Sequence, residues 1–191
     1  MLNVIYVVLV KNTINRLKHV ERLRLVIVQL CIDPTSVKKR EEYGHYEVDT
    51  IWSKRPSTAC LLTIIERKTR FLYARRLNTR QSDVVCDAIV DILQHLSPKT
   101  ITLDQGKEFS LYEIIEDKLL CDVYFSDAGK PYQRGSIENA NGLLRQYFPK
   151  GTDFKDVSDM EVQVAVEQIN TRPRMIFDYL TSEDMLFDEH N

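Results

Sequence analysis

The chain has 191 residues, 43% of them hydrophobic, which fits one globular domain with room for a short appendage. Its 26 basic and 28 acidic residues give a formal net charge of −2. This balance excludes a polycation, so any nucleic-acid surface must be a local patch. The four cysteines, Cys31, Cys60, Cys86 and Cys121, have no Cys-x-x-Cys spacing. We therefore expect buried thiols in a reducing cytoplasm and no zinc site.

Residues 1–35 differ from the rest of the chain. Two apolar runs, residues 4–10 and 23–32, flank a mixed charged stretch, and periodicity does not decide between strands and a helix. The first run is too short to cross a membrane, which takes about 20 apolar residues, and it lacks the flanks of a signal peptide. We predict that residues 1–35 are an atypical N-terminal segment outside the core, that residues 36–187 form the domain, and that the protein is cytoplasmic with no membrane partner.

From Tyr43 onwards the pattern becomes regular. Ser82 is expected to cap the first helix and Pro98 to stop it. Three strands, then alternating helices and strands, predict an α/β fold with a mixed five-stranded sheet flanked by helices. In chain order we predict strands at residues 45–52, 58–66 and 70–77, a helix at 81–96, a strand at 100–103, a helix at 108–119, a strand at 121–125, and helices from 133 or 136 to about 147 and from 157 to 169.

Three acidic residues stand at positions that suggest one metal site. Side chains alternate along a strand, so Asp49 shares a strand face with His45 and Glu47, and such a face is costly unless it is solvated, paired or metal-bound. Asp104 ends a predicted strand, where ligands gather in sheets flanked by helices, and Glu138 lies in the first turns of a helix. Three carboxylates can hold two hard cations that cut and join phosphodiester bonds. Alternatively, the placement of the three acids is a coincidence, because the helix dipole by itself favours a carboxylate such as Glu138 in the first turn.

One helix face surrounds the last of these acids. Arg134, Glu138, Asn141 and Arg145 are spaced to share that face. A nucleic-acid groove uses this mixture, although a solvated surface stripe would show it too. We expect the face to line a groove beside the metals, with Glu138 innermost. Further phosphate contacts could come from other basic residues: Lys38, Lys39, Arg40, Arg67, Lys68, Arg70, Arg75, Arg76 and Arg80.

Several segments together resemble the catalytic core of bacterial insertion-sequence transposases of the "IS thirty" type. The resemblance covers roughly residues 36–187, and the long segment around Glu138 is highly specific. The matching segments are residues 44–49, 65–70, 102–109, 131–152 and 170–174.

The resemblance implies a ribonuclease-H-like fold of the retroviral-integrase kind, with residues 36–187 as an integrase-like catalytic domain. It implies that Asp49, Asp104 and Glu138 are the catalytic residues of a DDE-type transposase and hold Mg²⁺ or Mn²⁺, as two ions that Asp49 bridges. It implies metal-dependent DNA strand cleavage and strand transfer in DNA transposition, with transposon ends and target DNA as partners and a homo-oligomer as the active form. We assign DNA contacts to Arg134, Asn141, Arg145 and Lys150.

The chain also departs from the family pattern. Tyr46 and Tyr132 stand where the family usually has Trp, and Ser182 stands where a proline is usual. Residues 1–35 do not resemble the helix-turn-helix region that binds transposon ends. We therefore expect an N-terminally truncated copy whose catalytic core survives. Two alternatives stay open: an inactive transposase remnant with non-specific DNA binding, and a ribonuclease-H-like nuclease acting on RNA–DNA hybrids.

Overall fold

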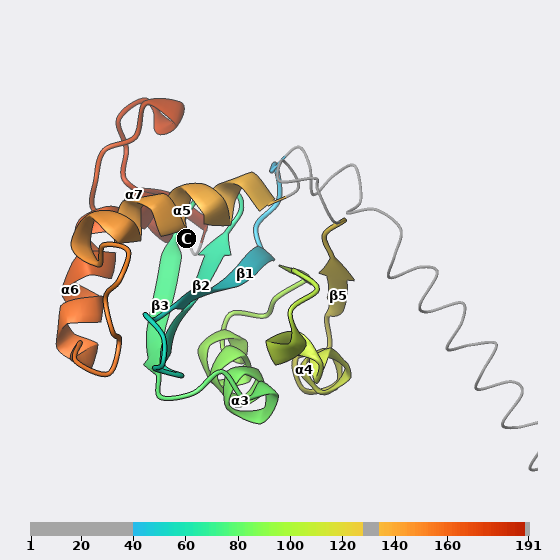
Figure 1. The fold of residues 1–191 in the computed structure, drawn as a ribbon. Coiled ribbons are helices and arrows are strands. Elements are labelled where there is room, and N and C mark those ends of the chain that lie inside the picture. Colours follow the sequence, from blue (N-terminus) through green and yellow to red (C-terminus); the bar gives the residue numbers. More distant parts are fainter. Residues whose placement is uncertain (1–39, 128–133, 190–191) are drawn as a thin grey trace, which may run out of the picture. The chain divides into compact units, whose positions relative to one another are not determined.

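The computed structural model describes residues 40–127 and 134–189 (Figure 1). The predictions for residues 1–35, including Cys31, lie outside the described residues, and the boundaries of the predicted domain therefore stay a prediction. The elements, in chain order, are β1 (His45–Trp52), β2 (Cys60–Glu66), β3 (Leu72–Leu77), α3 (Ser82–Leu93), β4 (Thr100–Leu103), η1 (Lys107–Phe109), α4 (Tyr112–Leu119), β5 (Asp122–Phe125), α5 (Gly135–Tyr147), α6 (Asp159–Asn170), η3 (Met175–Phe177) and α7 (Ser182–Glu189).

The described strands form one mixed sheet in the order β3-β2-β1-β4-β5. The pairs β1–β2 and β2–β3 are antiparallel, whereas β1–β4 and β4–β5 are parallel. The predicted mixed five-stranded sheet is confirmed. β1 is the central strand and runs parallel to β4, and the pairing of Glu47 with Thr102 places the carboxyl end of β4 beside the middle of β1, next to Asp49. Ligands of such sheets bind at the carboxyl ends of the strands.

Helices cover both faces of the sheet, and each face has its own core. Figure 1 shows α3 and α4 on one side and α5 and α6 on the other. Neighbouring strand residues point to opposite faces, so fully buried Ile64 packs with the α3 residue Ile89, while Ile65 packs with the α5 residue Ile137. Val48 of β1 faces the α3 side and Ile51 faces the α5 side.

A buried carboxylate fixes the start of α5 against β1. Glu47 has no exposed surface, and its Oε2 accepts a hydrogen bond of 2.8 Å from the backbone N–H of Ile137 in the first turn of α5. Its other oxygen, Oε1, lies 3.0 Å from Nε of Arg67, which is 3% exposed. The acidic face of β1 is therefore paired at Glu47. This pairing, with the helix dipole, holds α5 across the strand that carries Asp49.

Four local predictions need correction or extension. The single helix predicted at residues 108–119 is two elements, because the chain turns after the buried ring of Phe109 and α4 begins only at Tyr112. Ser82 does not cap α3: it is the first helical residue, and the cap position is Gln81, whose side chain makes no capping bond. The short elements η3 and α7 were not predicted. In α6, Ser158 and Glu161 form a reciprocal capping box that the sequence analysis missed.

The described residues also bear on the expected buried thiols and on membrane-spanning helices. Cys60, Cys86 and Cys121 are free and buried, which confirms the buried thiols for these three positions. Within residues 40–127 and 134–189, every helix is too short or too polar to cross a membrane.

Candidate functional site

A groove of about 1320 Å³ opens at the sheet edge where β1 and β4 end. Its walls come from the end of β1, the loop after β4, the start of α3 and the outer face of α5. Asp49 and Asp104 both line it, as do Asn141 and Arg145. The fold therefore brings four of the predicted site residues into one groove, although they come from three separate parts of the chain.

Backbone amides hold the two aspartates in fixed orientations. Asp49 Oδ1 accepts 2.8 Å from the N–H of Thr50, and Asp104 Oδ1 accepts 2.8 Å from the N–H of Gly106. The other oxygen of Asp49 accepts 2.9 Å from the side-chain amide of Asn141 on α5. Burial raises the pKa of the Asp49 carboxyl, and the Arg134 guanidinium opposes that rise. Both carboxylates are thus ordered before any ligand arrives.

The guanidinium of Arg134 lies between these carboxylates. Its Nη2 is 3.2 Å from Asp49 Oδ1, and its Nη1 is 3.5 Å from Asp104 Oδ2. Nη2 also donates to the backbone carbonyl of Val48 at 3.0 Å. Only 12% of the Arg134 side chain is exposed. A positive charge therefore occupies the position between the two acids, which is where the chemistry of the pair would place a cation.

Glu138 does not lie innermost on this helix face, and that expectation is wrong. Its side chain is exposed and does not line the groove, although it shares a helix face with Arg134, Asn141 and Arg145. The reason is geometric: Arg134, at the residue that precedes α5, reaches back over the carboxyl end of β1, and Glu138 one turn later projects to solvent. Among residues 40–127 and 134–189, no three His, Cys, Asp or Glu side chains are grouped so that they could hold a metal ion.

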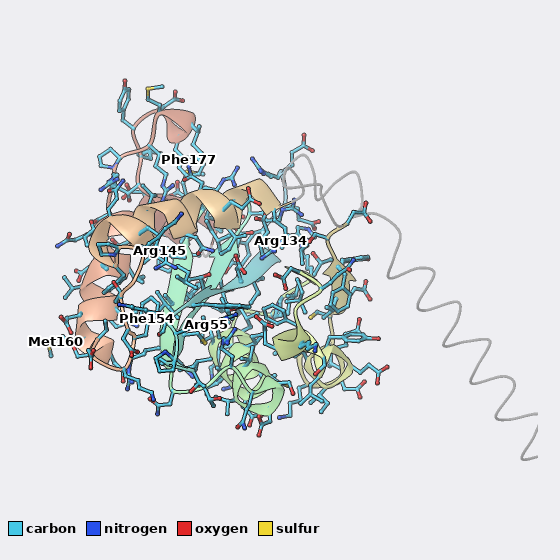
Figure 2. The ribbon with its side chains drawn as sticks, viewed as in Figure 1. Arg55, Arg134, Arg145, Phe154, Met160 and Phe177 are labelled. Carbon is cyan, nitrogen blue, oxygen red and sulfur yellow. The ribbon has the colours of Figure 1, made fainter. Side chains whose placement is uncertain are left out.

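The four predicted DNA contacts have different surroundings. Arg134 bridges the acids, and Asn141 holds Asp49. Arg145 lies in the groove wall towards the other end of α5, as Figure 2 shows. It donates to the backbone carbonyls of Phe148, Pro149 and Trp52 over 3.3–3.5 Å. Lys150 is exposed and lies outside the groove lining. Their contacts with DNA stay predictions.

Most of the other basic residues in the described part of the chain have acidic or polar protein partners. Of the further basic residues that the sequence analysis named for phosphate contacts, Arg80 lines the groove. The partners of the others include buried Glu47 for Arg67, Glu189 for Lys68, Ser136 for Arg70, Asp91 for Arg75 and Asp159 for Arg76.

The sequence analysis missed two acidic residues of the groove, Asp83 on α3 and, next to Asp104, Glu108. Its Oε1 accepts 2.8 Å from the hydroxyl of Thr50, and its Oε2 faces the same space beside Gly106 as Asp104 Oδ1. A Cβ at position 106 would lie 2.6 Å from Glu108 Oε2 and 2.8 Å from Asp104 Oδ1, so the two carboxylates can approach only because residue 106 is glycine. The signal was available in the short spacing from Asp104 to Glu108 around a glycine.

Two of the three predicted metal ligands, Asp49 and Asp104, are placed where they could bind a divalent cation. Asp49 and Asp104 offer hard oxygen donors, which Mg²⁺ and Mn²⁺ prefer, and they already surround one cationic group. The third predicted ligand, Glu138, is on the adjacent helix and turned outwards.

The fold is that of a retroviral integrase catalytic core, which is ribonuclease-H-like. The chain superposes on the crystal structure of the catalytic core domain of BIV integrase with a TM-score of 0.61 and 16% sequence identity. The superposition covers 77% of this chain and 96% of that one. The predicted fold class is confirmed.

Sequence comparison leads to a narrower group. A family model described as "Integrase core domain" matches residues 39–131, which include Asp49 and Asp104 and end before α5. The chain is 37% identical over 153 residues to the transposase for insertion sequence element IS4351 of Bacteroides fragilis, covering 79% of this chain and 47% of that protein. It is 32% identical over 154 residues to transposase InsI for insertion sequence element IS30C of Escherichia coli (strain K12), covering 79% and 40%.

These similarities confirm the predicted resemblance to the catalytic core of insertion-sequence transposases of the IS30 type. The chain spans less than half the length of these two relatives.

Proposed function

We propose that this chain is the catalytic core of a DDE-type transposase that cleaves DNA strands at transposon ends and joins them to target DNA. The single observation that carries the proposal is the convergence of Asp49 and Asp104 on one cationic group beside the carboxyl end of β4. The similarity to transposases and the integrase-like fold support it.

In this proposal Asp49 and Asp104 would hold Mg²⁺ or Mn²⁺, and Glu138 would be the third ligand if Arg134 gave up its position between the carboxylates. Bound divalent cations would polarise the attacking oxygen and stabilise the leaving oxygen of an in-line displacement at phosphorus. Asn141 and the Thr50 amide keep the Asp49 carboxylate oriented. The Gly106 amide does the same for Asp104.

The basic residues of the groove position the DNA in this proposal. Arg145 lies on the groove wall and contacts the sugar–phosphate backbone, and Arg134, once released, adds a second phosphate contact. Such contacts fix register without reading sequence, so we expect DNA binding by this chain alone to be weak, salt-dependent and largely independent of sequence. The active form is a homo-oligomer that acts in the bacterial cytoplasm.

The test is a Mg²⁺-dependent cleavage and strand-transfer assay of the full chain on DNA that carries the ends of a related insertion element. Calorimetry with Mn²⁺ gives an independent readout, in which Asp49→Asn and Asp104→Asn should each lower the affinity strongly because each removes a charged ligand. Asp83→Asn is the matched control, since Asp83 lines the same groove from α3. Unchanged Mn²⁺ affinity in Asp49→Asn would refute the metal assignment.

Two outcomes separate the alternatives. An RNA–DNA hybrid that is cut in preference to DNA would show a ribonuclease-H-like nuclease. DNA binding without metal affinity or cleavage would show an inactive remnant.

A further inference from the structure

Trp52 is the single tryptophan of the chain, and it forms part of the groove beside the paired aspartates. It is the last residue of β1, three positions after Asp49. Its exposed fraction is 52%. A lone exposed aromatic residue is ordinary, but this one stands within the groove next to the acids. Its neighbours therefore decide whether it has a role.

The indole ring is held in one orientation by a chain of hydrogen bonds. Its Nε1–H donates to Thr50 Oγ1 at 3.0 Å, and the Thr50 hydroxyl donates to Glu108 Oε1 at 2.8 Å. The backbone carbonyl of Trp52 accepts from Arg145 at 3.5 Å. These contacts satisfy the one polar atom of the indole and leave an aromatic surface that is exposed but ordered, so little conformational entropy is lost when a ligand covers it.

A guanidinium adds to this surface. The Cζ of Arg80 lies 3.8 Å from the centroid of the Trp52 ring, which is a close cation–π contact. Arg80 comes from the segment just before α3, so the pair joins two walls of the groove. A flat π surface with a stacked cation is the combination that binds bases and backbone of single-stranded nucleic acid, because every base has a π face and every nucleotide a phosphate.

We propose that Trp52, with Arg80, forms a stacking site for an unpaired nucleobase of the DNA strand that enters the groove. The inference rests on the proposed function, because it takes DNA as the substrate. In duplex DNA the base faces are covered by their neighbours, so the site selects a strand whose bases near the carboxylates have left the stack. It therefore favours DNA with a frayed or single-stranded segment over fully paired DNA, independently of sequence.

The experiment titrates the full chain in EDTA, so that no strand is cut, with three DNAs of one sequence. One is a fully paired duplex, one carries a short single-stranded extension, and one carries the same extension with abasic sites in place of its bases. The abasic DNA keeps the phosphates and removes the stacking partner. Intrinsic fluorescence reports on Trp52 alone, and anisotropy of a labelled strand gives the affinity.

We expect the extension to quench Trp52 fluorescence and to bind about 5- to 150-fold more tightly than its abasic counterpart. In Trp52→Ala this ratio should fall to about one, whereas Trp52→Phe should retain part of it, and melting temperatures check that both variants fold. Equal binding of all three DNAs with unchanged fluorescence overturns the stacking site but leaves the proposed function standing. Absence of binding to all three overturns the stacking site, and the Mg²⁺-dependent cleavage assay then decides separately on the proposed function.

Discussion

Arg134→Gln removes the guanidinium that lies between the Asp49 and Asp104 carboxylates and leaves a shorter, uncharged polar side chain. In the metal-free protein the change leaves two acidic groups without their shared positive charge. In the metal-bound protein it removes a competitor for the same position. The substitution should therefore weaken the folded state without metal and strengthen metal binding, two effects of opposite sign from one side chain.

The magnitude follows from the two contacts. The Arg134 and Asp49 side chains are 12% and 23% exposed, so their 3.2 Å contact should contribute about 1.5–3 kcal/mol. The 3.5 Å contact with Asp104, which is 37% exposed, is screened by solvent and adds at most about 0.5 kcal/mol. We expect a loss of about 2 kcal/mol in the free energy of unfolding, or a melting temperature about 4–8 °C lower.

The same free energy should reappear in metal affinity. Because Mn²⁺ no longer has to displace the guanidinium, its dissociation constant should fall about 30-fold. Calorimetry and thermal melts with and without Mn²⁺ measure both effects, and Arg145→Gln is the control, since Arg145 donates to backbone carbonyls instead. A variant that melts like the wild type and binds Mn²⁺ no more tightly would refute the reasoning.

Four smaller perturbations test the rest of the site. Glu47→Gln takes the carboxylate from buried Arg67 and should lower the free energy of unfolding, measured by urea denaturation, by about 3–5 kcal/mol. An unchanged free energy of unfolding would show that the ion pair does not stabilise the fold. Gly106→Ala puts a methyl group against Asp104 and Glu108, and calorimetry should show Mn²⁺ affinity at least about 10-fold weaker. The melting temperature should stay near that of the wild type, and unchanged Mn²⁺ affinity would contradict the prediction. Arg145→Ala should weaken DNA binding and reduce its salt dependence by about one phosphate contact, at a cost of about 1 kcal/mol in stability, whereas a global loss of folding would make it structural. Burial raises the pKa of Cys60 and of Cys121 to about 12, so mass spectrometry should find both unalkylated by iodoacetamide at pH 8 in the native state and labelled once unfolded.

The sequence was most informative where local periodicity and burial agree. β1 occupies the residues predicted for it, and most of them are buried because both faces of this central strand are covered. Helix α5 was also predicted, and its inner face, with Ile137, Ala140 and Leu144, is buried as its spacing indicates. The sequence indicated that the acidic face of β1 must be solvated, paired or metal-bound. It did not predict the partners of Glu47, because Arg67 and the backbone of α5 are distant in the chain.

Side-chain reach and tertiary placement account for what the sequence did not predict. Spacing put Arg134 and Glu138 on one helix face, but only the position of α5 over the sheet decides which of them meets the aspartates. Trp52 and Arg80 lie far apart in sequence and meet because β1 ends beside the start of α3. α7 is short and largely acidic, so it had no apolar stripe to predict it.

The charges around the aspartate pair connect the observed arrangement with the proposed one. Four acidic residues line the groove, Asp49, Asp83, Asp104 and Glu108, and three basic ones, Arg80, Lys107 and Arg145, which with Arg134 balance them. Without metal the groove therefore carries no excess positive charge to attract the phosphate of a DNA strand. If two divalent cations were bound with Glu138 as third ligand, and Arg134 stayed beside the groove, four positive charges would be added and one negative charge, and the net charge would become positive, as a phosphodiester requires. The guanidinium released by this exchange is then free to bind a phosphate. The long, flexible side chain of Arg134 at the residue before α5 can make such an exchange while Glu47 keeps the first turn of the helix attached to β1.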